Sequence, residues 1–117
     1  MGFLEVLHKG AVVFLYLPFK KEIESENPNP EEVLEMANNL LLAIGENQEF
    51  KRMIVKVLLF KGCALLELDR SKEAFKSWGK IIFNYRDDTD SEVSKYVIAS
   101  YGMLDEVMDA LVAVHAM

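Results

Sequence analysis

Three side chains of this sequence have the chemistry of nucleophiles or metal ligands, namely Cys63 and the two histidines, His8 and His115. A catalytic thiol needs a nearby histidine and an electropositive setting, whereas Cys63 has only Lys61 close to it in sequence. The histidines stand at opposite ends of the chain, without the His-Glu-x-x-His spacing of a zinc site. We therefore expect His8 at a helix surface, His115 near a helix C-terminus, and neither catalysis nor a bound metal.

Acidic residues alternate in the stretch Asp88-x-Asp90-x-Glu92. A calcium loop of the EF-hand type continues with glycine, but Val93 stands in that place. Thr89, followed three residues later by Glu92, has instead the pattern of a capping box, which starts a helix. A polar turn before a helix is the favoured interpretation, with a calcium site as the alternative. The sequence has no glycine-rich phosphate loop, so we expect no cofactor.

The length and the charge of the chain limit the class of protein. A chain of 117 residues is expected to form one domain. Its 13 basic and 19 acidic residues give a net charge of −6, which disfavours nucleic acids and anionic membranes as partners. The apolar run Gly10–Leu17 is too short to cross a bilayer, so we interpret it as core helix, with an uncleaved anchor as the alternative. A single cysteine is typical of a reducing compartment, which predicts a cytoplasmic protein.

Apolar residues recur at helical spacing through most of the chain, and no segment alternates as a β-strand does. Asn29, Pro30 and Gly45 have the residue types of the cap, the first position and the end of one helix. Pro18 is expected to end the helix before it and to begin an irregular segment that reaches Asn29. The chain is thus predicted to be all-α with about five helices, at residues 2–17, 30–45, 48–68, 71–85 and 90–116.

Similar short stretches indicate an internal repeat. Residues 8–11 (HKGA) match residues 60–63 (FKGC), and Gly102 lies in a looser match. Glycine inside a helix costs roughly 1 kcal/mol relative to alanine. The placement of Gly10, Gly62 and Gly102 therefore predicts that a neighbouring helix approaches closely at each of them. Coincidence among the 6 glycines of the chain is the alternative.

Six residues have the large-small-large pattern of side chains that pack across a helix pair, Leu58, Gly62, Leu65, Leu68, Ala74 and Trp78. In this pattern, residues 53–86 resemble one unit of the tetratricopeptide repeat family. Three departures are Asp69, at a turn where glycine is common, Ile81, in place of a small residue, and Arg86, in place of a proline. The resemblance implies antiparallel helix hairpins stacked as a short α-solenoid in one domain, 1–117, with a degenerate repeat at 1–45, the best repeat at 48–86 and a terminal or capping helix at 90–117.

In this family the first helix of each pair lines a concave face that binds other proteins, so the resemblance implies an interaction module without catalysis. Leu59 and Cys63 stand where the family's clamp for acidic peptide ends has lysine and asparagine. An apolar peptide or helix is therefore the implied partner. A homodimer over the same face is one alternative, and burial of that face as ordinary core by the last helix is another. The implied protein-binding residues are Leu7, Ala11, Phe14, Lys56, Leu59, Cys63, Leu66, Glu67, Tyr96, Ala99 and Met103.

Overall fold

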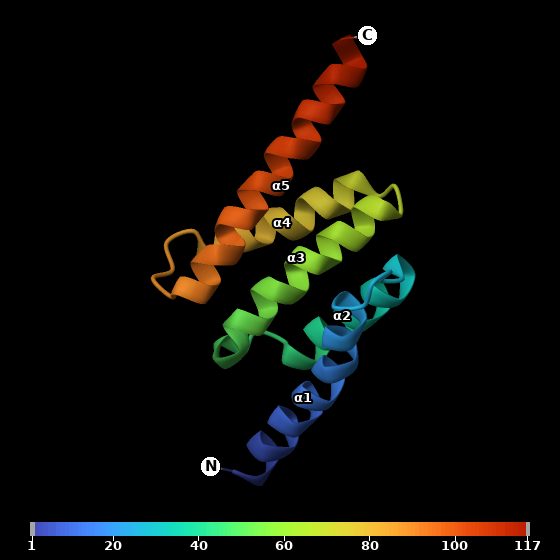
Figure 1. Cartoon of the computed structure of the whole chain (residues 1–117). Helices are drawn as coiled ribbons and strands as arrows, with labels where there is room; N and C mark the ends of the chain where they lie inside the picture. The colour runs from blue at the N-terminus through green and yellow to red at the C-terminus, as the bar shows by residue number, and fades with distance from the viewer. Residues whose placement is uncertain (1, 117) are drawn as a thin grey trace.

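The computed structural model describes the backbone of residues 2–116 and the side chains of residues 2–113. Five α-helices and no strand occur in this part of the chain, which confirms the predicted all-α class. The molecule is elongated, 59 × 32 × 21 Å, and its first and last helices lie at opposite ends (Figure 1). The helices are Phe3–Ile23 (α1), Pro30–Ile44 (α2), Lys51–Glu67 (α3), Ser71–Tyr85 (α4) and Ser91–Ala116 (α5), and a short 3-10 turn, Gln48–Phe50 (η1), precedes α3.

The start and the end of α2 follow from the local sequence. The side chain of Asn29 accepts hydrogen bonds from the backbone N–H groups of Glu31 and Glu32, at 3.0 and 3.3 Å. Pro30 occupies the first helical position, where its missing N–H leaves no hydrogen bond unmade. Gly45 ends the helix with φ +63°, a conformation that a residue with a side chain adopts only with strain. The predicted boundaries of this helix are confirmed.

Pro18 does not end α1, so the predicted boundary is wrong and the helix continues to Ile23. A proline inside a helix costs about 3 kcal/mol, because it removes a hydrogen bond and crowds the preceding turn. Pro18 itself is exposed, but the next residue, Phe19, is fully buried, and Ile23 is half-buried. Burial of one such large apolar side chain contributes about 1.5–3 kcal/mol. Packing therefore offsets the proline, and the predicted irregular segment shrinks to residues 24–29.

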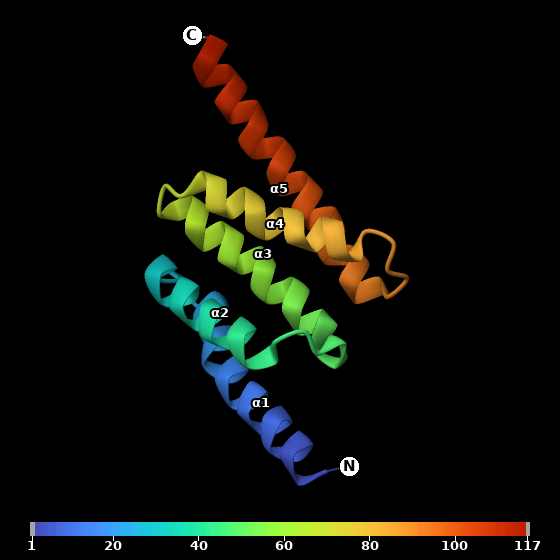
Figure 2. The same cartoon turned by 180° about the vertical axis from the view of Figure 1, so that it is seen from behind.

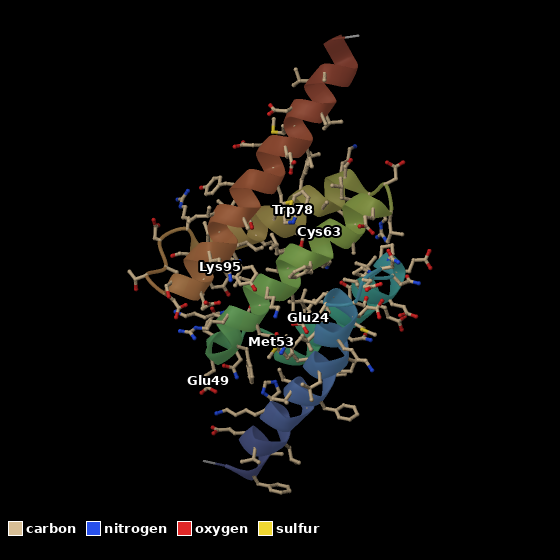
Figure 3. All side chains as sticks on the ribbon, in the orientation of Figure 1. Glu24, Glu49, Met53, Cys63, Trp78 and Lys95 are labelled. Carbon is tan, nitrogen blue, oxygen red and sulfur yellow. The ribbon has the colours of Figure 1, made fainter. Side chains whose placement is uncertain are left out.

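Helices α3 and α4 approach each other closely at Gly62, as predicted for this glycine. The fully buried indole ring of Trp78 lies between the two helices, beside Gly62 (Figure 3). Its Nε1–H donates a hydrogen bond to the backbone carbonyl of Leu59 at 3.1 Å, and the Ser77 hydroxyl donates to that of Leu58 at 2.6 Å. The missing side chain of Gly62 thus lets a large aromatic ring pack directly on the backbone of α3.

Gly10 and Gly102 have no such neighbour, and the prediction of a close approach is wrong for both. A methyl group added at either glycine would meet nothing within 4 Å among the described atoms. Both residues lie on exposed sides of their helices, α1 and α5. The match between residues 8–11 and 60–63 therefore does not reflect equivalent packing.

The acidic turn before α5 fastens this helix to the start of α3. The side chain of Asp90, and not Thr89 as predicted, caps α5 and accepts two backbone hydrogen bonds from its first turn, at 3.0 and 3.1 Å. Asp90 also pairs with Arg52 at 2.8 Å, and Asp88 pairs with Lys51 at 3.0 Å. A charged carboxylate accepts stronger hydrogen bonds than a hydroxyl and also attracts Arg52, which explains why the cap lies one residue later than predicted.

Each helix packs against the next one in the chain, and α3 also contacts α5. The largest fully buried side chains, which come from the first four helices, are Trp78, Phe19, Leu40, Leu65 and Ile81. The core therefore runs continuously from α1 to α4, with α3 between its two neighbours.

Helix α5 joins this core from Val93 to Val107, and residues 108–113 are exposed. Val93 and Val97 are buried, whereas Met108, Leu111 and Val112 are exposed. The second half of the helix extends beyond the other helices in both views (Figure 1 and Figure 2). It does not fold back over the rest of the molecule.

Candidate functional site

His8 and Cys63 have side chains that could do chemistry, but the structure places His8 in a contact between two helices and Cys63 in a half-buried position. His8 Nε2 lies 2.7 Å from the backbone carbonyl of Ala43, so this side chain joins α1 to the end of α2. Cys63 is half-buried, and burial, followed by the negative charge of Glu67, raises the pKa of its thiol. The thiol is therefore protonated at neutral pH and is not activated as a nucleophile. His115 lies outside the described side chains.

The carboxylates of the acidic turn, Asp88 and Asp90, accept hydrogen bonds from backbone and side-chain groups of the protein itself. Asp88 accepts a hydrogen bond from the backbone N–H of Asp90 at 2.8 Å, and this bond, followed by the one from Lys51, lowers the pKa of Asp88. The hydrogen bonds from Arg52 and from the backbone of α5 lower the pKa of Asp90. Among the described residues, no three histidine, cysteine or acidic side chains converge as a metal site requires.

A hollow lies where α1, α3 and α5 meet. It is a cavity of about 280 Å³ whose lining comes from three helices that are far apart in the sequence. Its lining includes two tyrosines and a methionine. The lining residues are Tyr16, Arg52, Met53, Lys56, Glu92 and Tyr96.

Lys56 is held in place inside this hollow by Tyr16. Its ammonium group donates a hydrogen bond to the Tyr16 hydroxyl at 2.9 Å and lies 5.5 Å from the centre of the same ring. Burial disfavours the charge of Lys56, but the hydrogen bond and charge interaction with Tyr16, together with Tyr96 and Glu24, outweigh it, so the pKa of Lys56 is raised. Burial raises the pKa of Tyr96 as well. Lys56 therefore remains charged, and part of its charge is already engaged within the protein.

A second hollow follows along the same side of α3. Cys63 stands seven residues after Lys56, so the two side chains leave the helix in nearly the same direction, about two turns apart. Figure 3 shows Met53 and Cys63 along α3, one for each hollow. We call the surface formed by both hollows the inner face. The second hollow, a cavity of about 180 Å³, is lined by Ile23, Pro28, Pro30, Val33, Phe60, Cys63, Ala64 and Glu67.

The structure distributes the predicted binding residues of α3 over both hollows. Lys56 lines the first one, and Cys63 and Glu67 line the second. Leu66 is at the margin, with 36% of its surface exposed. Leu59 is only 7% exposed and packs in the core, so a partner would reach little of it.

The predicted residues of α5 lie on the inner side of their helix. Tyr96 lines the first hollow. Ala99 and Met103 are half-buried and pack against the core, on the side of α5 that carries Tyr96. Tyr96 of α5 and Lys56 of α3 therefore line the same hollow, whereas Ala99 and Met103 pack against the core.

The predicted residues of α1 do not join them. Leu7, Ala11 and Phe14 are exposed, Phe14 to 76%, but they leave α1 on the side roughly opposite Tyr16, since a helix turns about 100° per residue. Their assignment rested on aligning Gly10 with Gly62, and these two glycines pack differently. The structure therefore leaves them apart from the inner face.

Sequence reasoning missed Tyr16, Met53 and the residues around Pro28. A usable signal existed for Tyr16, because it lies at the edge of the apolar stripe that contains Phe19 and Ile23. Taking Pro18 as the end of the helix removed the second half of that stripe from view. Nothing local indicates that Pro28 lies near α3, since this contact depends on how α2 packs.

Comparison with protein-family models, with curated proteins and with solved structures finds no match to this chain. Within the described part of the chain, no helix combines the length and the apolar character that a membrane span requires.

Proposed function

We propose that this chain is a non-catalytic protein-protein interaction module, built as a short tetratricopeptide-like α-solenoid, whose inner face holds an apolar peptide or helix. The observation that carries the proposal is the placement of Tyr16, Met53 and Tyr96, from three separate helices, around one hollow. Aromatic residues dominate the energetics of many protein interfaces, and methionine adapts to varied apolar partners. Stacked helix pairs present such extended surfaces in repeat proteins.

The charges around the hollow support an apolar partner. Lys56 is hydrogen-bonded to Tyr16, and Arg52 is paired with Asp90. A charged partner would have to compete with these internal contacts. The surfaces that remain available are the aromatic rings, the methionine, the methylene stem of Lys56 and the exposed carboxylate of Glu92. A segment with large apolar side chains would bury the rings and the methionine without disturbing the pairs.

A peptide library displayed on phage, selected on the wild-type chain, tests the proposal. We expect enrichment of peptides with two or more large apolar residues. Their affinity should fall at least about tenfold in Tyr96→Ser, as for a buried aromatic contact. Ile98→Ser is the matched control, because Ile98 is 71% exposed on the other side of α5. Equal binding to both variants, or selection of charged peptides without apolar residues, would contradict the proposal.

The alternative is that a second copy of the chain covers the inner face. Light scattering after size-exclusion chromatography, over a concentration series, distinguishes the two. A dimer that Tyr96→Ser dissociates selects the homodimer.

A reducing compartment such as the cytoplasm is part of the proposal, because the half-buried Cys63 is the single cysteine and has no partner for an internal disulfide.

A further inference from the structure

A second groove lies on the other side of α3, between α2 and α4, and we call it the outer groove. It is a cavity of about 350 Å³ with an apolar floor formed by Leu34, Leu58 and Leu65. Leu58 and Leu65 leave α3 roughly opposite Lys56 and Cys63, so the outer groove is separate from the inner face. An inference from this groove is therefore independent of the proposed function.

The walls of the outer groove are basic, although the whole chain has a net charge of −6. Lys61, Lys76, Lys80 and Arg70 line it, with Glu73 as its one acidic lining residue. Glu73 pairs with Arg70, whereas none of the three lysines forms an ion pair with a carboxylate of the described residues. Burial, followed by the nearby charges of Lys80 and Arg70, lowers the pKa of Lys61. Cations are thus concentrated there without enough internal carboxylates to balance them.

The last turns of α5, residues 105–113, which we call the tip, have the opposite character. Asp105, Glu106 and Asp109 are exposed, and the tip contains no lysine or arginine. Met108 and Leu111 continue the stripe that is buried near the start of α5, yet Met108 is 55% exposed there. At about 100° per residue, Asp105 and Asp109 leave the helix about 60° and 100° from Met108, and Asp109 lies roughly opposite Leu111. The tip is therefore an acidic helical segment in which Val107 packs against the core, whereas Met108 is left largely uncovered by the other described residues.

The tip cannot reach the outer groove of its own chain. Helix α5 is continuous from Ser91 to Ala116, and both views show its second half pointing away from the other helices (Figure 1 and Figure 2). The tip of a second copy of the chain is not restricted in this way, because it is not joined to the helices that form the groove.

We propose that the tip of α5 from one copy docks in the outer groove of a second copy, with Met108 toward Leu34 and with Asp105 and Asp109 beside the lysines. Two features support this occupant: the opposite charges of the two surfaces, and the exposed Met108 of the tip, for which the groove offers the half-buried Leu34. Electrostatic complementarity of this kind fixes orientation and speeds association. Burial of Met108 supplies the rest of the driving force.

A charge-swap experiment tests this contact. One variant, Lys76→Glu/Lys80→Glu, reverses the groove, and another, Asp105→Lys/Asp109→Lys, reverses the tip. All four side chains are exposed, so both variants are expected to fold, which circular dichroism verifies. Lys20→Glu/Lys21→Glu changes the net charge as much as the groove variant does, at exposed positions on α1, and serves as the control.

Sedimentation velocity over a concentration series gives the readout. We expect self-association of the wild type and of the control at low salt, weakened by added salt. Each reversed variant alone should associate at least about tenfold more weakly, because like charges then face each other. An equimolar mixture of the two reversed variants should associate again, since every tip then meets a groove of opposite charge.

Three results would overturn the proposal. They are a wild type that stays monomeric at all concentrations at low salt, a dimer that neither reversal weakens, and reversed variants that fail to associate when mixed. A dimer that depends on Tyr96 instead of the lysines would assign self-association to the inner face. That outcome rejects the docking of the tip and selects the homodimer alternative of the proposed function.

Discussion

Replacement of Gly62 by alanine is the sharpest test of how α3 and α4 pack. A Cβ atom at this position would lie 2.2 Å from Nε1 of Trp78 and 2.5 Å from its Cε2. Ordinary contacts between such atoms begin near 3.4 Å. The indole ring would therefore have to move by about 1 Å, within a core where atoms are closely packed. Trp78 is fully buried, so no open space receives it.

The magnitude follows from three opposing contributions. Alanine improves the helix propensity of α3 by about 1 kcal/mol. Overpacking of a core costs about 1–3 kcal/mol, and a buried donor that loses its acceptor costs about 1–3 kcal/mol more. The donor at risk is Trp78 Nε1–H, which now bonds the carbonyl of Leu59. We expect Gly62→Ala to lower the free energy of unfolding by about 2–4 kcal/mol.

Urea unfolding followed by circular dichroism measures this change. Trp78 is the single tryptophan, so its fluorescence reports the same contact directly. Gly79→Ala and Gly102→Ala are the controls, because both helical glycines face open space, and each should gain up to about 1 kcal/mol. In a Trp78→Leu background, Gly62→Ala should become neutral or stabilising. If Gly62→Ala in the wild type behaves as the two controls do, the reasoning about this close approach is refuted.

Two further predictions concern the turn at Gly45 and the loss of stability at low pH. Gly45→Ala should destabilise the protein by about 1–3 kcal/mol although it causes no clash, because alanine at φ +63° is strained. Gly10→Ala should stabilise the protein, and thermal unfolding compares the two variants. The pKa values of Asp88 and Asp90 are lowered in the folded state, so their stabilisation is complete above about pH 5 and is lost as the pH falls through the folded pKa values. Asp88→Asn/Asp90→Asn should therefore flatten the fall of the melting temperature in acid, and an unchanged slope would assign the acid sensitivity to other carboxylates.

Local sequence predicted those elements whose boundaries depend on neighbouring residues. Asn29 and Gly45 bound α2 because a cap needs an acceptor side chain and a C-terminal turn needs a permissive backbone, and both requirements are visible in the sequence. Gly62 was also interpreted correctly, but the same argument, the cost of a glycine inside a helix, gave wrong predictions for Gly10 and Gly102. Pro18 was misjudged, since its effect depends on the burial of Phe19, which no local pattern quantifies.

The candidate site could be predicted only in part. Lys56, Cys63 and Tyr96 were chosen from helical spacing and a family resemblance, and they do lie on the surface of the two hollows. Leu7 and Phe14 were chosen from an alignment of glycines and lie on another side of α1. Spacing within one helix gives the relative directions of its side chains, but it does not give the rotation of that helix against its neighbours.

The sequence by itself determined that the chain is all-α, where α2 and α4 begin and end, and that Gly62 is a packing position, because these depend on periodicity, caps and the absence of a side chain. Only the tertiary structure decided that α1 passes through Pro18, that Asp90 caps α5, and that Tyr16 and Tyr96 meet across one hollow. The physical reason is that these outcomes depend on which surfaces of distant helices bury each other. Burial energies of that kind exceed the local preferences of single residues.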